Sequence, residues 1–153
     1  MGLEEVKAFL KDKGFEDRLI ETGDSSKTVA LAAQALGCKE ESIVKSMAFL
    51  VEEKPILILL SGDVRIDNRK FKETFRVKAK MVDPTLLRNL VGHPMGGVCP
   101  FALKEDVKVY LDKSLEKLDI LYPAGGTDHS AVKLTLDELK GLVGDSMVDV
   151  SKE

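Results

Sequence analysis

The sequence predicts an α/β (α+β) domain with a mixed, largely antiparallel sheet. Two strongly apolar runs, residues 43–51 and 56–60, are separated by a charged turn that ends in Pro55, and this pattern is typical of a central hairpin. Around the hairpin, short strand-like runs alternate irregularly with helical patterns, without the regular strand–helix repeat of a parallel fold. The 153 residues, 44% of them hydrophobic, are enough to bury one core. We therefore expect a single domain over residues 1–153.

The N-terminal third predicts two helices and a short strand. Apolar residues at helical spacing predict an amphipathic helix over residues 3–13, ended near Gly14. Residues 18–22 read as a short strand. Hydroxyl residues over 25–28 then offer an N-cap for an alanine-rich helix that continues to Leu36, and Gly37 stands where a C-terminal glycine belongs.

The middle of the chain carries two further helix starts. Asp67 is a candidate N-cap for a helix with two phenylalanines at i and i+4. Residues 78–82 predict a short strand. Asp83-Pro84 has the acid and proline typical of a helix start, and Gly92 ends the apolar face that follows. A loop rich in glycine and proline leads from there to a strand that we expect near Val98.

The last third predicts short strands and one helix. Residues 106–111, 119–122 and 131–134 read as strands. Thr135 and Glu138 form a capping-box pattern that opens the last amphipathic helix. Residues 147–150 are expected to close the chain as an edge strand.

Composition excludes several classes of protein. No apolar run approaches the roughly 18 residues of a membrane span, and the N-terminus lacks the pattern of a signal peptide. Two cysteines provide no disulfide framework and suit a reducing compartment, so we expect a cytoplasmic protein. The net charge of −3 argues against broad coating of nucleic acid, which needs many basic contacts. Recognition of one nucleic-acid end by a local basic patch is still compatible with this charge.

Lys45 is an anomaly in its strand. Both faces of residues 43–51 are mainly apolar, so the strand is expected to be central, where a lysine is costly unless it is paired or functional. The alternative is a lysine near the strand entrance whose ammonium reaches water.

Two glycine-rich loops are the other candidate sites. Residues 91–101 and 123–130 combine glycine and proline, which mark ordinary turns but also expose backbone N–H groups that bind oxyanions. His93, Cys99 and His129 allow a thiol–imidazole pair, although a cysteine without a chemical role is the simpler reading. Asp128-His129 either binds a ligand or organises its turn by side-chain hydrogen bonds.

Metal and nucleotide signatures are absent from the sequence. There is no CxxC, HExxH, GxGxxG or GxxxxGK[ST] pattern, so we expect no metal and no cofactor. A basic run from Arg65 to Lys80 either contacts phosphates or forms a solvated helix face.

Three separated motifs resemble the YbaK family, also called the aminoacyl-tRNA deacylase or prolyl-tRNA synthetase-associated editing domain. They are Ile43-Val44-Lys45-Ser46, Gly96-Gly97-Val98-Cys99-Pro100 and Tyr122-Pro123-Ala124-Gly125-Gly126. The resemblance covers nearly the whole chain in the same order and spacing, and only residues 61–82 match loosely. It implies a mixed sheet curled towards a barrel and flanked by helices. It also implies hydrolysis of the ester that joins a wrong amino acid to a tRNA, commonly cysteine or alanine on proline tRNA.

The resemblance assigns roles to individual residues. Lys45 matches the strand lysine that is essential for deacylation in the family. The residues expected to bind substrate are Ser46, Gly96, Gly97, Val98, Cys99, Pro100, Gly125, Gly126, Asp128 and His129. Cys99, Asp128 and His129, together with His93-Pro94, vary within the family, so they leave the amino-acid specificity open.

We expect a trans-editing hydrolase for translation fidelity whose partner is the acceptor end of an aminoacylated tRNA. Prolyl-tRNA synthetase is a second candidate partner. The rival from another class is a module that binds an aminoacyl-tRNA or a synthetase without hydrolysis. A hydrolase that uses the Cys99 thiol is a more distant alternative.

Overall fold

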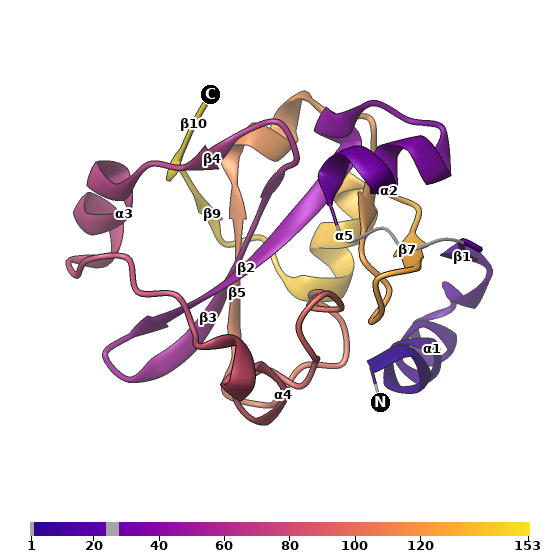
Figure 1. The fold of residues 1–153 in the computed structure, drawn as a ribbon, viewed down its shortest axis with the longest axis horizontal. Helices are drawn as coiled ribbons and strands as arrows, with labels where there is room; N and C mark the ends of the chain where they lie inside the picture. Colours follow the sequence, from indigo (N-terminus) through magenta and orange to yellow (C-terminus); the bar gives the residue numbers. More distant parts are fainter. Residues whose placement is uncertain (1, 24–27) are drawn as a thin grey trace.

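The computed structural model describes residues 2–23 and 28–153 (Figure 1). The helices are α1 (Gly2–Lys13), α2 (Val29–Leu36), α3 (Asn68–Phe75), α4 (Leu87–Leu90) and α5 (Leu136–Val143). Short 3-10 turns are η1 (Glu16–Arg18), η2 (Glu40–Ser42), η3 (Pro84–Leu86) and η4 (Lys113–Lys117). The strands are β1 (Leu19–Glu21), β2 (Ile43–Val51), β3 (Lys54–Ser61), β4 (Arg65–Ile66), β5 (Lys108–Asp112), β6 (Ile120–Pro123), β7 (Ser130–Val132), β8 (Leu134–Thr135), β9 (Met147–Val148) and β10 (Ser151–Lys152).

The main sheet is mixed and curled, as Figure 1 shows. In the described part of the chain its strand order is β8-β6-β2-β3-β5-β9, and the pairs β1–β7 and β4–β10 lie beside it. The long β2–β3 pairing is antiparallel, as is β6–β8. The pairings β2–β6, β3–β5 and β5–β9 are parallel. The predicted α/β fold with a mixed sheet is confirmed.

The central hairpin is the longest strand pairing in the described part of the chain. Its register runs from Val44 opposite Ser61 to Val51 opposite Lys54. Glu52 and Glu53 form the turn with φ angles of 52° and 69°. Positive φ at both turn residues matches the right-handed twist of the flanking strands, so the apolar runs set the pairing even without a glycine in the turn.

The helix ends follow the capping patterns read from the sequence. Thr28 accepts a hydrogen bond from the Leu31 N–H, and Gly37 ends α2 with a φ of 69°. The Asp67 carboxylate caps α3, and Thr135 and Glu138 complete a reciprocal capping box at α5. The other hydroxyl residues predicted at the α2 cap, Ser25 and Ser26, lie outside the described residues.

Three predicted strands are corrected by the structure. Residues near Val98 form irregular loop, because the adjacent Gly97 packs against the Gly126 backbone of another loop and not against a strand. Residues 78–82 make only an isolated bridge between Met81 and Phe49. The run 131–134 divides at Lys133, since β7 pairs with β1 whereas β8 pairs with β6.

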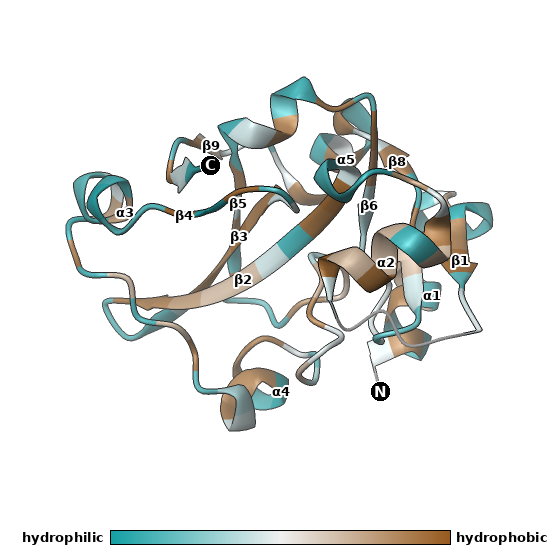
Figure 2. Ribbon diagram, turned by 45° about the horizontal axis from the view of Figure 1, so that its top comes forward, coloured by the Kyte–Doolittle hydropathy of each residue, from teal (hydrophilic) through white to brown (hydrophobic). Residues whose placement is uncertain are grey.

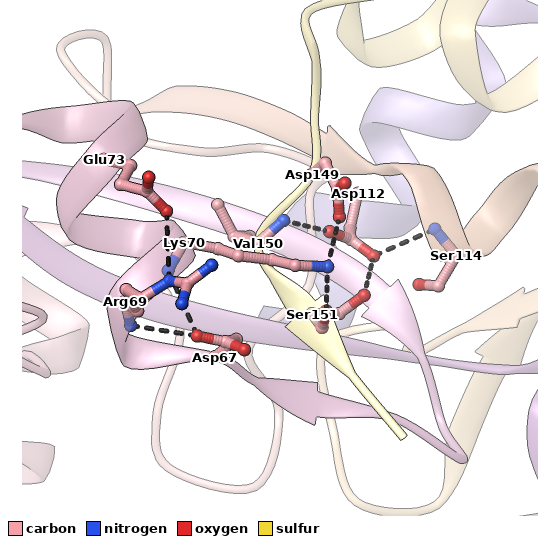
Figure 3. Close-up of polar contacts among 9 residues, drawn as sticks. All are labelled: Asp67, Arg69, Lys70, Glu73, Asp112, Ser114, Asp149, Val150 and Ser151. Carbon is pink, nitrogen blue, oxygen red and sulfur yellow. Dashed lines mark hydrogen bonds and ion pairs between the residues drawn. The ribbon is translucent and has the colours of Figure 1, made fainter.

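The C-terminal segment docks onto β5 through one buried carboxylate (Figure 3). Asp112 accepts hydrogen bonds from the Val150 N–H at 2.8 Å and the Ser151 hydroxyl at 2.6 Å. It also accepts from the Ser114 N–H at 2.9 Å. These bonds explain why β9 ends at Val148 and the chain continues into β10, a two-residue strand without a pattern to predict it.

Two apolar clusters cover the two faces of the hairpin. The larger contains Val44, Ala48 and the α5 residue Leu139. The smaller is aromatic: the Phe71 ring lies 4.9 Å from Phe49 and 4.7 Å from Phe75, centroid to centroid. β2 is therefore central, as its sequence predicted, and a polar residue within it requires an explanation.

Candidate active site

The outer edge of β2 is unpaired at its middle. On the side away from β3, β6 pairs with β2 only at Ile43 and Val44. Further along, Leu50 N–H donates to the Lys80 carbonyl at 2.8 Å and Val82 N–H donates to the Ala48 carbonyl at 3.0 Å. Among the described residues, no strand pairs with residues 45–47 on this edge. A gap in the sheet is thus built at Lys45 and Ser46.

A cavity of about 560 Å³ opens at this gap. Its lining comes from α2, β2, β4 and β6 and from the segments 81–87, 95–98 and 124–131. A hydrophilic band crosses the otherwise pale to brown ribbon of β2 in Figure 2. The cavity therefore places polar groups of a central strand against mainly apolar walls.

Lys45 extends from β2 into this environment. Lys45 is one of the residues that line the cavity, and its ammonium donates a hydrogen bond to the Val64 carbonyl. Burial lowers the pKa of Lys45, and the Asp63 carboxylate opposes part of that shift. One N–H of the ammonium is thus bound to backbone, while the partly exposed side chain leaves the alternative of an ammonium that also reaches water open.

Ser46 presents its backbone N–H and C=O to the same gap. In an antiparallel strand the N–H and C=O of one residue point to the same edge, and this edge alternates along the chain. Since the Ala48 carbonyl and Leu50 N–H point outward, the backbone groups of Ser46 do so too. The buried Ser46 hydroxyl has no hydrogen-bond partner among the described residues. The outward backbone N–H and C=O of Ser46, beside the cavity and without a strand to pair with in the described residues, are suited to a ligand.

The predicted site residues divide into two groups. Lys45, Ser46, Gly96 and Val98 line the cavity. The remaining predicted residues are all described and lie outside its lining: Gly97, Cys99, Pro100, Gly125, Gly126, Asp128 and His129. Contact with substrate stays a prediction for both groups.

The two glycine-rich loops pack directly against each other. A Cβ built on Gly97 would lie 2.4 Å from the Gly126 carbonyl oxygen. On Gly126 it would lie 2.6 Å from the Gly2 backbone, and on Gly125 it would lie 2.8 Å from the Leu19 side chain. These glycines allow close backbone approach. Gly97, Gly125 and Gly126 thus hold the loop that presents Gly96 and Val98 to the cavity.

Cys99 and His93 form a buried contact away from the cavity. Both are fully buried, and the sulfur lies 3.5 Å from His93 Nε2. Nε2 lies 2.6 Å from the Phe101 carbonyl, which only accepts, so Nε2 carries the proton and is not a base for the thiol. Burial raises the pKa of Cys99 to about 12. The pair therefore closes the loop and lacks an ionised thiol.

Asp128 and His129 form an exposed pair at 3.1 Å between Oδ1 and Nδ1. Asp128 also lies beside the loop residue Gly96, because a Cβ built on Gly96 would be 3.7 Å from the Asp128 Cβ.

Within residues 2–23 and 28–153, no three His, Cys, Asp or Glu side chains gather as a metal-binding group. In the same residues, no helix has the length and apolar character to cross a membrane.

Sequence reasoning missed the wall that α2 provides. Val29, Ala32 and Leu36 line the cavity, yet α2 had been assigned no role in a site. A signal was present, because residues 29–36 contain no charged residue although only Ala33 is buried. An apolar helix with so little buried surface marks a surface that faces a ligand or partner.

The basic run from Arg65 to Lys80 divides between the cavity and the surface. Arg65 lines the cavity, whereas Arg69 is exposed and pairs with Glu73 at 3.5 Å.

Comparison with known proteins relates this site to a family. The family model for the aminoacyl-tRNA editing domain matches residues 24–142. The uncharacterized protein YwhH of Bacillus subtilis (strain 168) is 41% identical over 140 residues, which are 91% of this chain and 89% of that protein. A proline–tRNA ligase of Latilactobacillus sakei subsp. sakei (strain 23K) is 30% identical over 122 residues, which are 77% of this chain but 21% of the ligase.

A solved structure agrees with these matches. It is described as that of a proposed trans-editing enzyme for prolyl tRNA synthetase, and it superposes with a TM-score of 0.90 at 31% identity. The match covers 99% of this chain and 98% of that one. The resemblance seen in the three motifs is thereby confirmed: the chain belongs to the aminoacyl-tRNA editing domain family.

Proposed function

We propose that the chain is a cytoplasmic trans-editing hydrolase that deacylates a mischarged aminoacyl-tRNA. Cysteine or alanine on proline tRNA is the first candidate substrate, and prolyl-tRNA synthetase is a candidate partner. One observation carries the proposal: in a chain of the editing family, Lys45 and the unpaired edge at Ser46 line a cavity of about 560 Å³. This volume lies in the range of small-molecule sites and suits an aminoacyl group with its terminal ribose.

The chemistry asks little of the protein. Water adds to the ester carbonyl carbon, the bond from that carbon to the ribose oxygen breaks, and the ribose oxygen leaves with a proton. Lys45 stabilises the negative charge that develops on the carbonyl oxygen, and the outward N–H of Ser46 is a second donor. The described lining contains no carboxylate and no histidine, so we assign no general base. No metal or cofactor is required for this step.

Specificity follows from the walls of the cavity. Apolar side chains of α2 and the 81–87 segment limit the size of the aminoacyl group, while the backbone of Ser46 offers polar contacts common to all amino acids. A pocket of this kind excludes a larger cognate group and leaves room for a smaller wrong one. The acceptor end of the tRNA is held locally, so we expect a shallow dependence of binding on salt.

The test is single-turnover hydrolysis of alanyl-, cysteinyl-, seryl- and threonyl-tRNA by the parent protein, Lys45→Ala and Cys99→Ser. We expect the parent to hydrolyse at least one of them and Lys45→Ala to lose about 10²–10³ in rate, as when one oxyanion donor is removed. Cys99→Ser should react within a few-fold of the parent, since the thiol is buried and protonated.

Two outcomes would contradict the proposal. Binding of these tRNAs without hydrolysis would favour the non-catalytic module. Loss of hydrolysis in a folded Cys99→Ser protein, with Lys45→Ala still active, would favour the thiol hydrolase.

A further inference from the structure

The ammonium of Lys45 is held by a turn that is distant in sequence. Residues 61–64 connect β3 to β4, and the carbonyl of Val64 accepts the hydrogen bond from Lys45 Nζ. The orientation of the ammonium therefore depends on where this carbonyl points. Contacts that hold the turn in place therefore also hold the Lys45 ammonium in place.

Ser61 and Gly62 anchor the start of this turn. The Ser61 hydroxyl lies 2.7 Å from both the Glu41 carbonyl and an Asp63 carboxylate oxygen, and its N–H donates to the Ser114 hydroxyl at 3.0 Å. A Cβ on Gly62 would lie 2.3 Å from the Glu40 carbonyl oxygen. The turn is thus held by contacts with η2 on one side and with η4 on the other.

Asp63 anchors the end of the turn that carries Val64. Both of its carboxylate oxygens lie 2.9 Å from Lys117 Nζ. Burial works to raise the pKa of Asp63, but hydrogen bonds from Ser61 and Lys117 outweigh it and hold this pKa below its ordinary value. Asp63 is consequently ionised at neutral pH, next to the residue that binds the Lys45 ammonium.

Among the described residues, few other charged groups lie near Lys45. The titratable or charged groups that share the described cavity lining with it are Arg65 of β4 and Tyr122 of β6. Lys117 of η4 pairs with Asp63. Burial lowers the pKa of Lys45, and Asp63 is the carboxylate that opposes this effect. Asp63 therefore influences both the place and the charge of the ammonium.

We propose that Asp63 is a positioning residue for Lys45: Asp63 fixes the Val64 carbonyl that binds the ammonium, and it places a negative charge next to that carbonyl. The inference rests on the proposed function for its catalytic consequence. The link between Asp63 and Lys45 stands on the structure and is measurable without any tRNA.

The experiment compares three single variants with the parent. Asp63→Asn removes the charge and keeps an oxygen for Ser61. Lys117→Gln breaks the same ion pair but leaves the Asp63 charge in place. Asp149→Asn is the matched control, because Asp149 pairs with Lys70 at 3.1 Å (Figure 3) and, in the described part of the chain, makes no hydrogen bond or ion pair with residues 61–64. The lysines of the two pairs are similarly exposed, 39% for Lys117 and 38% for Lys70.

Two readouts are measured on each protein. The first is the pKa of Lys45, from an NMR titration of its side-chain signals, which are assigned by their loss in Lys45→Arg. The second is the single-turnover rate between pH 6 and 9, corrected for spontaneous ester hydrolysis. We expect Asp63→Asn to lower the pKa of Lys45 further and to reduce the rate by about 10- to 100-fold, the range for a displaced catalytic group, most strongly at high pH. Lys117→Gln should not lower this pKa, and Asp149→Asn should match the parent in both readouts.

A purely structural role for the ion pair predicts a different result. Asp63→Asn and Lys117→Gln would then weaken the protein alike and leave the pKa of Lys45 unchanged, which would overturn the inference. If no protein hydrolyses any tRNA but the pKa of Lys45 still falls in Asp63→Asn, the proposed function fails while the link between the two residues stands.

Discussion

The two halves of β2 share one ladder and serve different purposes. Both pair with β3 in continuous register, so their backbones are equally fixed on that side. On the other side, the second half is covered by residues 80–82, whereas Lys45 and Ser46 have no neighbouring strand among the described residues. The comparison shows how the site is made. β3 fixes the position of β2 on one edge, and the absence of a strand on the other edge leaves the backbone at Lys45 and Ser46 open to a ligand.

The energetics of the halves differ in the same way. Phe49 is 2% exposed and contacts Phe71 at a centroid distance of 4.9 Å, so it contributes apolar burial. Lys45 is partly buried at a cost, because burial disfavours its charge. A central strand tolerates such a residue only where the rest of the hairpin provides the stability.

The largest expected effect is a difference in stability between variants in the two halves of β2. Phe49→Ala should lower the free energy of unfolding by about 3–5 kcal/mol, since it removes a buried ring and leaves a cavity. Lys45→Met should change it by less than about 1.5 kcal/mol, because one lost hydrogen bond is offset by relief of the buried charge. Urea denaturation of the two variants beside the parent measures both values. Equal losses would mean that the two halves are equivalent structural elements.

A smaller effect tests the same contrast in the glycine-rich loop. Gly97 packs against Gly126, so Gly97→Ala should cost about 1–3 kcal/mol through overpacking. Gly96 lines the cavity with space around it but has a φ of +88°, so Gly96→Ala should cost about 1 kcal/mol of backbone strain. Thermal melts of both variants provide the comparison. A larger loss for Gly96→Ala would contradict the packing role of Gly97.

The smallest expected effect depends on pH. Burial lowers the pKa of His93, although the hydrogen bond to the Phe101 carbonyl and the charge of Glu5 oppose part of this shift, so the folded protein favours neutral His93. Below the ordinary value of 6.5 the unfolded chain binds a proton that the folded chain does not, and stability therefore falls as the pH falls through that region. Between pH 7.5 and 5.5 the parent should lose about 2–4 °C in Tm more than His93→Gln, a shift typical of a change near 1 kcal/mol. Identical pH profiles would show that His93 titrates equally in both states.

Much of the fold was predictable because its signals are local. The caps at Thr28, Asp67 and Thr135 depend on hydroxyl or carboxylate groups within three residues of the N–H groups they satisfy. The hairpin follows from two apolar runs and a short turn. The two-residue strands β4 and β10 were missed, and a strand near Val98 was wrongly expected, because pairing partners rather than local composition decide such segments.

The sequence by itself determined the helices, the central hairpin and the anomaly of a lysine inside an apolar strand, since each depends on residues close together in the chain. Only the tertiary structure decided what surrounds that lysine. The unpaired edge at Ser46 arises because β6 and residues 80–82 each cover a different part of β2. Lys117, which is 54 residues from Asp63 in sequence, reaches the Val64–Lys45 contact through its ion pair with Asp63. Contacts of this range depend on how the chain folds back on itself, and short sequence patterns carry no information on which distant residues then meet.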